Sequence, residues 1–407
     1  MSEKDPIEEL FRFASSWFSE GDYVTAEQVC RAVLLSRPNH AAAHDMIGLI
    51  AVKLGNYRSA VACFQRAADA DPGFTDAKNH LESVRSYAER AAPPQPGPRY
   101  LVIKAWGFGF WSDVNHVLGA ALLAEITGRI PITQWGENSL FSDGVTEDAF
   151  GLYFEPVSES RLAELPLVTP RNVFAPKWAA VGLETPEHMK MEGPGSRLSG
   201  VHFLERSESI AVADFFFSVA ALAPWLPEAH PMHGQRSDAV YRYLVEKYLK
   251  PKPHILAAAA KLHRKLIGAE PAIAVHMRGS DKLLEADMTK LLPLYFEHLV
   301  REDAGLRIFL LTDDARCIAP FKQRYGDRVI VSDVLRTSTD LGVHYSPDAD
   351  RVRLGNEVLI DTYAALLCDR FVGNGMSNLS ALISVLKPWD ANACVLLGGS
   401  ILHLSLS

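Results

Sequence analysis

The sequence predicts two consecutive α/β units with parallel sheets, preceded by a small domain of helical repeats. Three observations support this fold class. Apolar strand-like segments alternate with helical segments from residue 99 onward, which is typical of parallel sheets covered by helices. The first ninety residues repeat with a period of 34. Residues 91–98, AAPPQPGP, contain four prolines and predict a stiff, extended linker between the two regions.

Composition limits the class of protein. A chain of 407 residues with 48% hydrophobic residues can form two or three domains with their own cores. The net charge of -8 argues against a general binder of nucleic acid or anionic membranes, which needs basic surface. The five cysteines show no CxxC or zinc-like spacing, so we expect buried free thiols. The charged start and the lack of a run of about 18 apolar residues predict a cytoplasmic protein without a signal peptide or membrane span.

The first ninety residues are predicted to be a tetratricopeptide-repeat domain, 1–90. Aligning residues 7–40 with 41–74 superposes four pairs: Gly21 on Gly55, Tyr23 on Tyr57, Ala26 on Ala60 and Pro38 on Pro72. Residues 75–91 are expected to form a capping helix. Because such stacks need about three repeats for stability, we expect this one to lean on the rest of the chain, a second copy of the protein or a partner peptide.

The first α/β unit, 99–250, opens with a strand, a glycine turn, a helix and a second strand, at 99–106, 107–113, 115–128 and 129–133. Gly107 and Gly109 either let an anionic ligand approach the N–H groups at the helix start, or only make a tight turn. The order of strands within 136–236 cannot be predicted. A helix at 237–250 precedes Pro251 and Pro253, which suggest a hinge.

The second unit, 251–407, has a more regular alternation. Strands are predicted at 273–276, 307–312, 328–331 and 370–373. Helices are predicted at 254–266, 291–302 and 355–367, and a further helix follows the second strand and ends at residue 325. This alternation predicts a parallel sheet with helices on both faces. Two such Rossmann-like units facing a cleft correspond to a GT-B type architecture.

Polar residues follow three strands of the second unit, where parallel sheets bind ligands. They are His276, Arg278, Asp281 and Lys282 after the first strand, Asp313 and Asp314 after the second, and Ser377 and Asn378 after the last. The planar guanidinium of Arg278 can hold a diphosphate without a metal, or it can form a buried structural ion pair with Asp281. Ser377 and Asn378 can bind phosphate at a helix start, or cap the helix, or do both.

Asp361 lies in an otherwise apolar helical segment, VLIDTYAALL. A buried carboxylate without a partner is costly, so Asp361 needs one. It can accept two N–H bonds from the edge of guanine, an edge that uracil and adenine do not offer. The alternative is a solvent-facing position on an amphipathic helix.

The segments HMRGSDK, FLLTDD and VLIDTYAALLCDRFVGNGMSN resemble the three motifs of the α1,6-fucosyltransferases, including the rhizobial nodulation enzymes, and of the wider group that holds protein O-fucosyltransferases. The resemblance spans residues 99–386 and excludes the repeats. It implies an inverting enzyme that uses GDP-fucose and needs neither a metal nor another cofactor. Arg278 would then hold the donor β-phosphate beside Asp281 and Lys282. The resemblance also assigns His276 and Asp361 to the nucleoside, Asp313 and Asp314 to the paired aspartates of the second motif, and Ser377 and Asn378 to the last phosphate-binding pair.

Two departures from the motifs stand out. Gly279 occupies the place of a second arginine, which puts the α1,6 linkage and the acceptor class in question. The place of the catalytic glutamate falls on Ala286, so we expect Glu285 to be the catalytic base, with Asp113 in the glycine turn as the competing choice.

Three other hypotheses on function also fit the sequence. One is a transferase of the same fold with another nucleotide sugar, such as UDP-N-acetylglucosamine. Another is a GT-A transferase that binds a metal through Asp348 and Asp350, although aspartates are common in such polar turns. A third is a non-catalytic nucleotide-binding scaffold. The expected partners of the protein are a nucleotide-sugar donor and a glycan or protein acceptor. The repeats are expected to bind a protein or to mediate homodimerisation.

Overall fold

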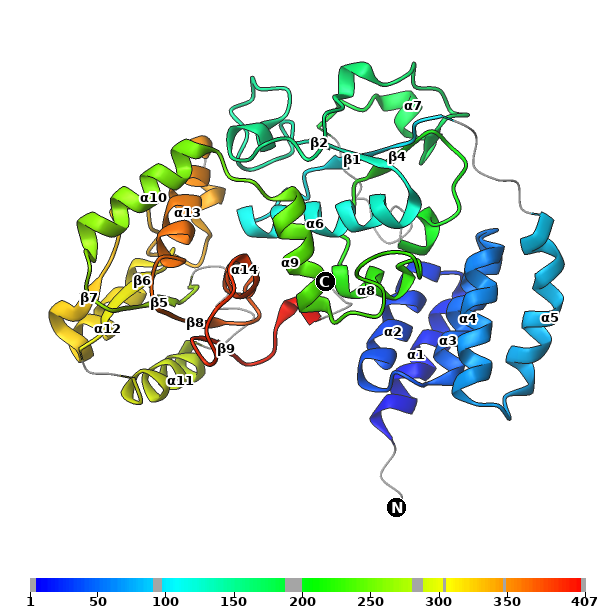
Figure 1. Ribbon diagram of the computed structural model, residues 1–407, viewed down its shortest axis with the longest axis horizontal. Coiled ribbons are helices and arrows are strands. Elements are labelled where there is room, and N and C mark those ends of the chain that lie inside the picture. Colours follow the sequence, from blue (N-terminus) through cyan, green and yellow to red (C-terminus); the bar gives the residue numbers. More distant parts are fainter. Residues whose placement is uncertain are drawn as a thin grey trace.

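The computed structural model describes residues 5–90, 97–186, 200–279, 288–302, 305–346 and 349–403. Figure 1 shows three parts in a row: a helical region on the right, one sheet with its helices in the centre, and a second sheet with its helices on the left. The elongated molecule therefore places the helical region beside the first sheet and away from the second.

The helical region consists of five helices that pack as antiparallel neighbours. They are α1 (Pro6–Glu20), α2 (Tyr23–Ser36), α3 (Ala41–Lys53), α4 (Tyr57–Ala70) and α5 (Thr75–Arg90). A Cβ on Gly48 would lie 2.4 Å from the Phe64 ring, so a small residue lets α3 and α4 approach closely. The helices follow the 34-residue spacing, and α5 is the predicted last helix. Their assignment to tetratricopeptide repeats stays a prediction.

The helical region rests on the rest of the chain, which was one of the three supports considered from the sequence. The Asn56 side-chain amide donates to the Val201 carbonyl. Trp225 contacts two arginines of the helical region, with the guanidinium carbons of Arg31 and Arg66 5.3 and 5.7 Å from its ring centroid. Val201 and Trp225 both pack against the apolar core of the helices.

The first sheet contains β1 (Tyr100–Lys104), β2 (Ile130–Gln134), β3 (Val173–Phe174) and β4 (Ile210–Ala213), all parallel in the order β2-β1-β4-β3. The helix α6 (Phe110–Thr127) covers one face, against Leu101 and Ile103. Val102 points to the other face and packs with Trp178 of α7 (Trp178–Val181). This opposite burial of successive residues is the strand period of two.

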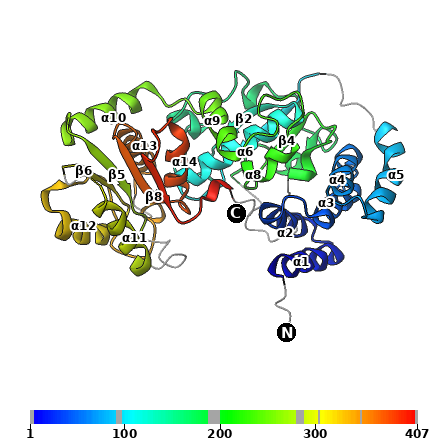
Figure 2. The same ribbon diagram turned by 60° about the horizontal axis from the view of Figure 1, so that its bottom comes forward.

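The second sheet contains β5 (Ala272–His276), β6 (Arg307–Leu311), β7 (Val329–Ile330), β8 (Arg370–Asn374) and β9 (Cys394–Leu397), all parallel in the order β7-β6-β5-β8-β9. One face is covered by α10 (Pro253–Leu266) and α13 (Arg351–Ala365), the other by α11 (Met288–Val300) and α12 (Ile318–Tyr325) (Figure 2). The predicted alternation and the helices on both faces are confirmed.

The two sheet units are joined by helices that contact both. α14 (Asn378–Leu386) follows β8 but packs against α6 and α9 (Ser237–Tyr248) of the first unit. Leu402, near the end of the described chain, is buried in the same core. The remaining short elements are α8 (Val219–Leu222) and the 3-10 turns Ala149–Leu152, Leu162–Glu164, Gly200–Phe203, Ala223–Trp225, Ala315–Cys317, Gly326–Arg328, Val343–Tyr345 and Ile401–His403.

Two expectations from composition can be compared directly. The five cysteines are free, as predicted; four of them are buried as expected, whereas Cys394 is only half-buried. In the part of the chain that the structure describes, no helix combines the length and the apolar character needed to cross a membrane.

Candidate functional site

The carboxyl ends of three neighbouring strands meet at one edge of the second sheet. His276 at the end of β5 lies level with Leu311 of β6 on one side and with Gly373 of β8 on the other. The chain builds β6 and β7 to one side of β5, then crosses to build β8 and β9 on the other. Open α/β sheets bind ligands at such a reversal of strand order, so the residues that follow β5 and β8 form the candidate site.

His276 spans this reversal point. Its Nδ1 lies 2.6 Å from the Ser380 hydroxyl oxygen on α14, and the Tyr295 hydroxyl donates to its backbone carbonyl at 2.6 Å. Burial lowers the pKa of His276 to about 4, which outweighs the raising effect of Asp313. The imidazole is therefore neutral at neutral pH and offers one donor and one acceptor.

Arg278 reaches from the second sheet to the first turn of α6 in the first unit. A Cβ on Gly109 would lie 3.7 Å from the Arg278 Nη1, so the guanidinium sits against this glycine. On the other side, the Arg278 Nε is 3.9 Å from the Asp313 Oδ2, and the Gly279 N–H donates to the Asp313 Oδ1 at 3.1 Å. Asp281, the partner considered from the sequence, lies outside the described residues.

The start of α6, which Arg278 contacts, is linked to the start of α14 through Asn115 and Asn378. α6 begins after Gly109 and α14 after Ser377, and neither helix has a side-chain cap. The Asn115 side-chain amide on α6 donates to the Asn378 side-chain oxygen at 2.8 Å, and the Tyr241 hydroxyl donates to Asn115 at 2.8 Å. The buried Ser377 hydroxyl has no hydrogen-bond partner among the described residues. Two linked, uncapped helix starts, one of them in contact with an arginine, favour an anion.

Asp361 is buried on α13, so the solvent-facing alternative is wrong. One carboxylate oxygen accepts the Ser332 hydroxyl at 2.6 Å, and the other is buried without a hydrogen-bond partner in the described part of the chain. Burial raises the pKa of Asp361 to about 7, although Ser332 and Arg336 act in the opposite direction. The site thus holds a carboxylate with one unused acceptor.

The packing of Gly279 against Asp314 explains why position 279 holds a glycine where the motif has a second arginine. The buried Asp314 carboxylate is bound by the Arg316 guanidinium, with an Nη2 to Oδ2 distance of 2.7 Å. A Cβ on Gly279 would lie 2.4 Å from the Asp314 Cβ. No side chain fits at position 279 unless Asp314 moves, so a second arginine is sterically incompatible with this arrangement.

The glycine turn is shorter than predicted. Gly107 has a φ of 75°, which a glycine adopts without strain, but α6 begins at Phe110 rather than near 115. Asp113 therefore lies in the first turn of α6, not in the glycine turn. It is buried and accepts the Phe108 N–H at 3.2 Å, which helps to fix the helix start.

Several expected site residues cannot be placed. Asp281, Lys282 and Glu285 lie outside the described residues, as does Asp348 of the alternative metal site. Asp350 caps α13 by accepting the Arg353 N–H at 2.9 Å. No group of three or more His, Cys, Asp or Glu side chains within the described ranges has a geometry that could hold a metal ion.

Comparisons with known proteins give neighbours in fold only. No protein-family model matches the chain, and no curated protein matches its sequence. The structure is similar to NodZ alpha-1,6-fucosyltransferase soaked with GDP-fucose, with a TM-score of 0.47, 18% identity and coverage of 72% of this chain and 94% of that one. It is also similar to POFUT1 in complex with GDP (0.43, 14%, 74% and 97%) and to a mutant of Arabidopsis thaliana FUT1 in complex with GDP (0.44, 11%, 77% and 73%).

Sequence reasoning missed several residues that the structure brings to the sheet edges. Asp214 directly follows β4 and Ser332 lies two residues after β7, so the rule that located the other site residues could have found them. Asp214 is buried and binds Lys177 at 2.7 Å. Asn115 gave no signal, because its role depends on contact between two helices that lie far apart in sequence.

Proposed function

We propose that the chain is an inverting, metal-independent glycosyltransferase that transfers fucose from GDP-fucose to a hydroxyl of a glycan or protein acceptor. The observation that carries this proposal is the position of Arg278 against the uncapped start of α6, a helix whose Asn115 binds Asn378 at the uncapped start of α14. A nucleotide diphosphate is the leaving group that such an arrangement suits.

The leaving diphosphate would be bound by groups from both sheet units. Arg278 supplies a fixed positive charge, and the Ser377 hydroxyl and the N–H groups that follow it supply donors. Donors held in place before the reaction stabilise the charge that develops on the departing phosphate, which is the task that a metal performs in other enzymes. Asp313 holds Arg278 in position, while Asp314 is occupied by Arg316 and contributes structurally.

The nucleoside would lie near His276 and Asp361. The unused oxygen of Asp361, together with its other oxygen, can accept the two N–H groups of the guanine edge. Uracil lacks this pair of donors, and binding it would leave a buried acceptor unsatisfied. This argument favours GDP over UDP as the nucleotide.

In the proposed reaction, the acceptor hydroxyl attacks the anomeric carbon, the bond to the diphosphate breaks, and a carboxylate takes the hydroxyl proton. We assign the base to Glu285, because Asp113 is fully buried in the first turn of α6 and already accepts the Phe108 N–H. Comparison of Glu285→Gln with Asp113→Asn tests this assignment. Loss of kcat in the first variant, with GDP binding retained, is the expected result.

Nucleotide choice is tested by thermal unfolding with GDP and with UDP. A ligand at about one hundred times its dissociation constant stabilises the folded state by about 2.7 kcal/mol. We expect this shift with GDP alone. An equal or larger shift with UDP would contradict the guanine assignment and favour a transferase for another nucleotide sugar.

Transfer is tested by measuring GDP release from GDP-fucose across a panel of glycan and peptide acceptors. Arg278→Ala should lower the rate about a hundredfold or more, the usual effect of removing one such donor. Arg301→Ala is the matched control, because Arg301 is exposed on the protein surface and pairs with Glu297. Retention of more than about a tenth of the rate in Arg278→Ala would refute the role of Arg278. Tight GDP binding with no turnover on any acceptor would favour a scaffold.

A further inference from the structure

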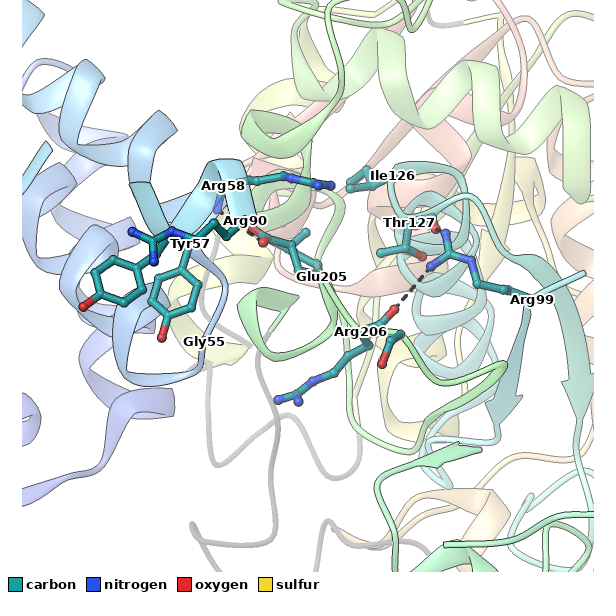
Figure 3. Close-up of a pocket in the computed structure, with 12 residues that line it drawn as sticks. Gly55, Tyr57, Arg58, Arg90, Arg99, Ile126, Thr127, Glu205 and Arg206 are labelled. Carbon is teal, nitrogen blue, oxygen red and sulfur yellow. Dashed lines mark hydrogen bonds between the residues drawn. The ribbon is translucent and has the colours of Figure 1, made fainter. Parts of the chain in front are cut away.

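A cavity lies at the junction between the helical region and the first sheet unit, apart from the candidate site. Its volume is about 600 Å³, within the range of pockets that bind small molecules or short peptide segments. Figure 3 shows residues of α4 and α5 on one side and Arg99, Ile126 and Thr127 on the other. The cavity is therefore built by segments from both ends of the linker.

The charge of the cavity is opposite to that of the whole protein. Four arginines line it, Arg58, Arg90, Arg99 and Arg206, whereas Glu205 is the acidic residue of the described lining. Both Glu205 oxygens already accept backbone N–H groups at the start of α4, from Arg58 at 3.2 Å and from Ser59 at 2.6 Å. In a chain with a net charge of -8, this concentration of arginines is a local feature that favours an anionic ligand.

Two of the arginines are fixed by hydrogen bonds to main-chain carbonyls rather than by acids. Arg99 donates to the Arg206 carbonyl at 3.2 Å, the contact drawn as a dashed line in Figure 3, and Arg206 donates to the His202 carbonyl at 2.7 Å. Burial lowers the pKa of both side chains, and Glu208 only partly offsets this effect for Arg206. A bound carboxylate would stabilise these charges.

An aromatic pair lies beside the arginines. The rings of Tyr57 and Tyr87 have centroids 5.3 Å apart, and Tyr87 is 54% exposed. The Arg90 guanidinium lies 5.8 Å from the Tyr87 ring centroid. Tyrosine and arginine are among the residues that contribute most to protein–protein binding, and here one exposed and one half-buried tyrosine lie next to arginines.

The cavity is remote from the donor site. Ile126 and Thr127 belong to the last turn of α6, whereas Arg278 contacts the start of that helix. A helix of 18 residues is about 27 Å long, so the ligand of this cavity does not reach the reacting atoms as a small molecule. The ligand of this cavity is therefore separate from the ligand of the donor site.

We propose that this junction cavity binds an acidic peptide segment of a partner protein. The arginines would contact its carboxylates, and the tyrosine rings would pack against its side chains or its peptide groups. The interaction does not depend on the proposed transfer reaction, and binding alone can test it.

The experiment is fluorescence anisotropy with the full chain and a fluorescein-labelled hexaglutamate peptide, with a hexaglutamine peptide of the same label as reference. Arg58→Ala and Arg90→Ala remove exposed arginines that line the cavity. Arg85→Ala is the matched control, because Arg85 is exposed on the same helix as Arg90 but does not line the cavity. We expect binding of hexaglutamate only, weakened about tenfold or more in the two cavity variants and unchanged in the control.

Three results would overturn the proposal. The first is no binding of hexaglutamate at about millimolar concentration, or equal binding in all variants. The second is full displacement by sulfate at the same charge concentration, which would make the cavity a simple anion site. The third is tighter binding of an acidic oligosaccharide such as oligogalacturonate with the same sensitivity to Arg90→Ala, which would make the ligand a glycan.

Discussion

Asp361→Asn should stabilise the free protein and abolish nucleotide binding. In the folded protein, burial raises the pKa of this carboxyl from its ordinary 3.8 to about 7, while one of its oxygens has no hydrogen-bond partner in the described structure. Ionised Asp361 is therefore destabilising until a ligand satisfies it. Asparagine has nearly the same shape and no charge, so the substitution removes this penalty.

The sign and size of the effect of Asp361 on the free energy of unfolding follow from proton linkage. Because the folded pKa lies above the unfolded one, the folded protein binds more protons between these values, and its free energy of unfolding falls as pH rises from about 4 to about 7. The shift of about three pKa units corresponds to about 4 kcal/mol above neutral pH. At about pH 5 the penalty is only about 2 kcal/mol, since much of the carboxyl is protonated in the folded state.

The assay is urea unfolding of wild type and Asp361→Asn at about pH 5 and pH 8. The variant should be more stable at both values, and its advantage should grow by about 2 to 3 kcal/mol between them. The lowered pKa of His276 gives wild type a pH dependence of opposite sign, but this effect is present in both proteins and cancels in the difference. Exposed Asp327 provides the control substitution Asp327→Asn.

The reasoning is refuted if the difference between wild type and Asp361→Asn does not change with pH, or if the variant is less stable at about pH 8. The companion measurement is thermal unfolding with GDP. It should shift for wild type and not for the variant, because asparagine lacks the second acceptor for the guanine edge. A variant that is stabilised and still binds GDP would separate the stability argument from the guanine assignment.

Three further substitutions test contacts around the site and the junction. Gly279→Ala should lower the free energy of unfolding by about 1 to 3 kcal/mol in urea titrations, because its Cβ would overlap Asp314; an unchanged midpoint would mean that Asp314 moves freely. Trp111→Phe removes the 3.1 Å hydrogen bond from the indole N–H to the Thr362 hydroxyl and should destabilise the contact between α6 and α13 by about 1 kcal/mol, measured in the same way and contradicted by a more stable variant. Glu205→Ala removes the cap of α4 and should cost about 1 to 2 kcal/mol, seen as faster amide hydrogen exchange in the first turn of that helix; exchange as slow as in wild type would show that the cap is dispensable.

Four strands of the second sheet could be predicted from sequence because each is separated from the next by a helical segment, whereas the edge strand β9 was missed. The first sheet was predicted only at its start. β3 has two residues and β4 has four, and both lie among loops, so neither gives a periodic signal. α6 begins at Phe110, earlier than the predicted residue 115, because Phe110 and Trp111 follow two glycines and resemble a continuation of the turn.

The candidate site was predictable where a strand end alone positions a side chain. His276, Asp313 and Ser377 belong to this class. Contacts between units were not predictable, because the pairing of Asn115 with Asn378 exists only after the two units pack together. The burial of Asp361 belongs to the same class, since an aspartate in an apolar helix can face either solvent or a neighbouring helix.

The contacts of Arg31 and Arg66 with the Trp225 ring mean that the helical region cannot be removed without exposing part of the first sheet unit. A truncated clone that begins at residue 99 would bare the indole of Trp225 and the side chain of Val201 to water, and we expect it to self-associate. Arg31 and Arg66 would in turn lose their aromatic partner, so the helical region and the first sheet unit depend on each other for burial of these side chains.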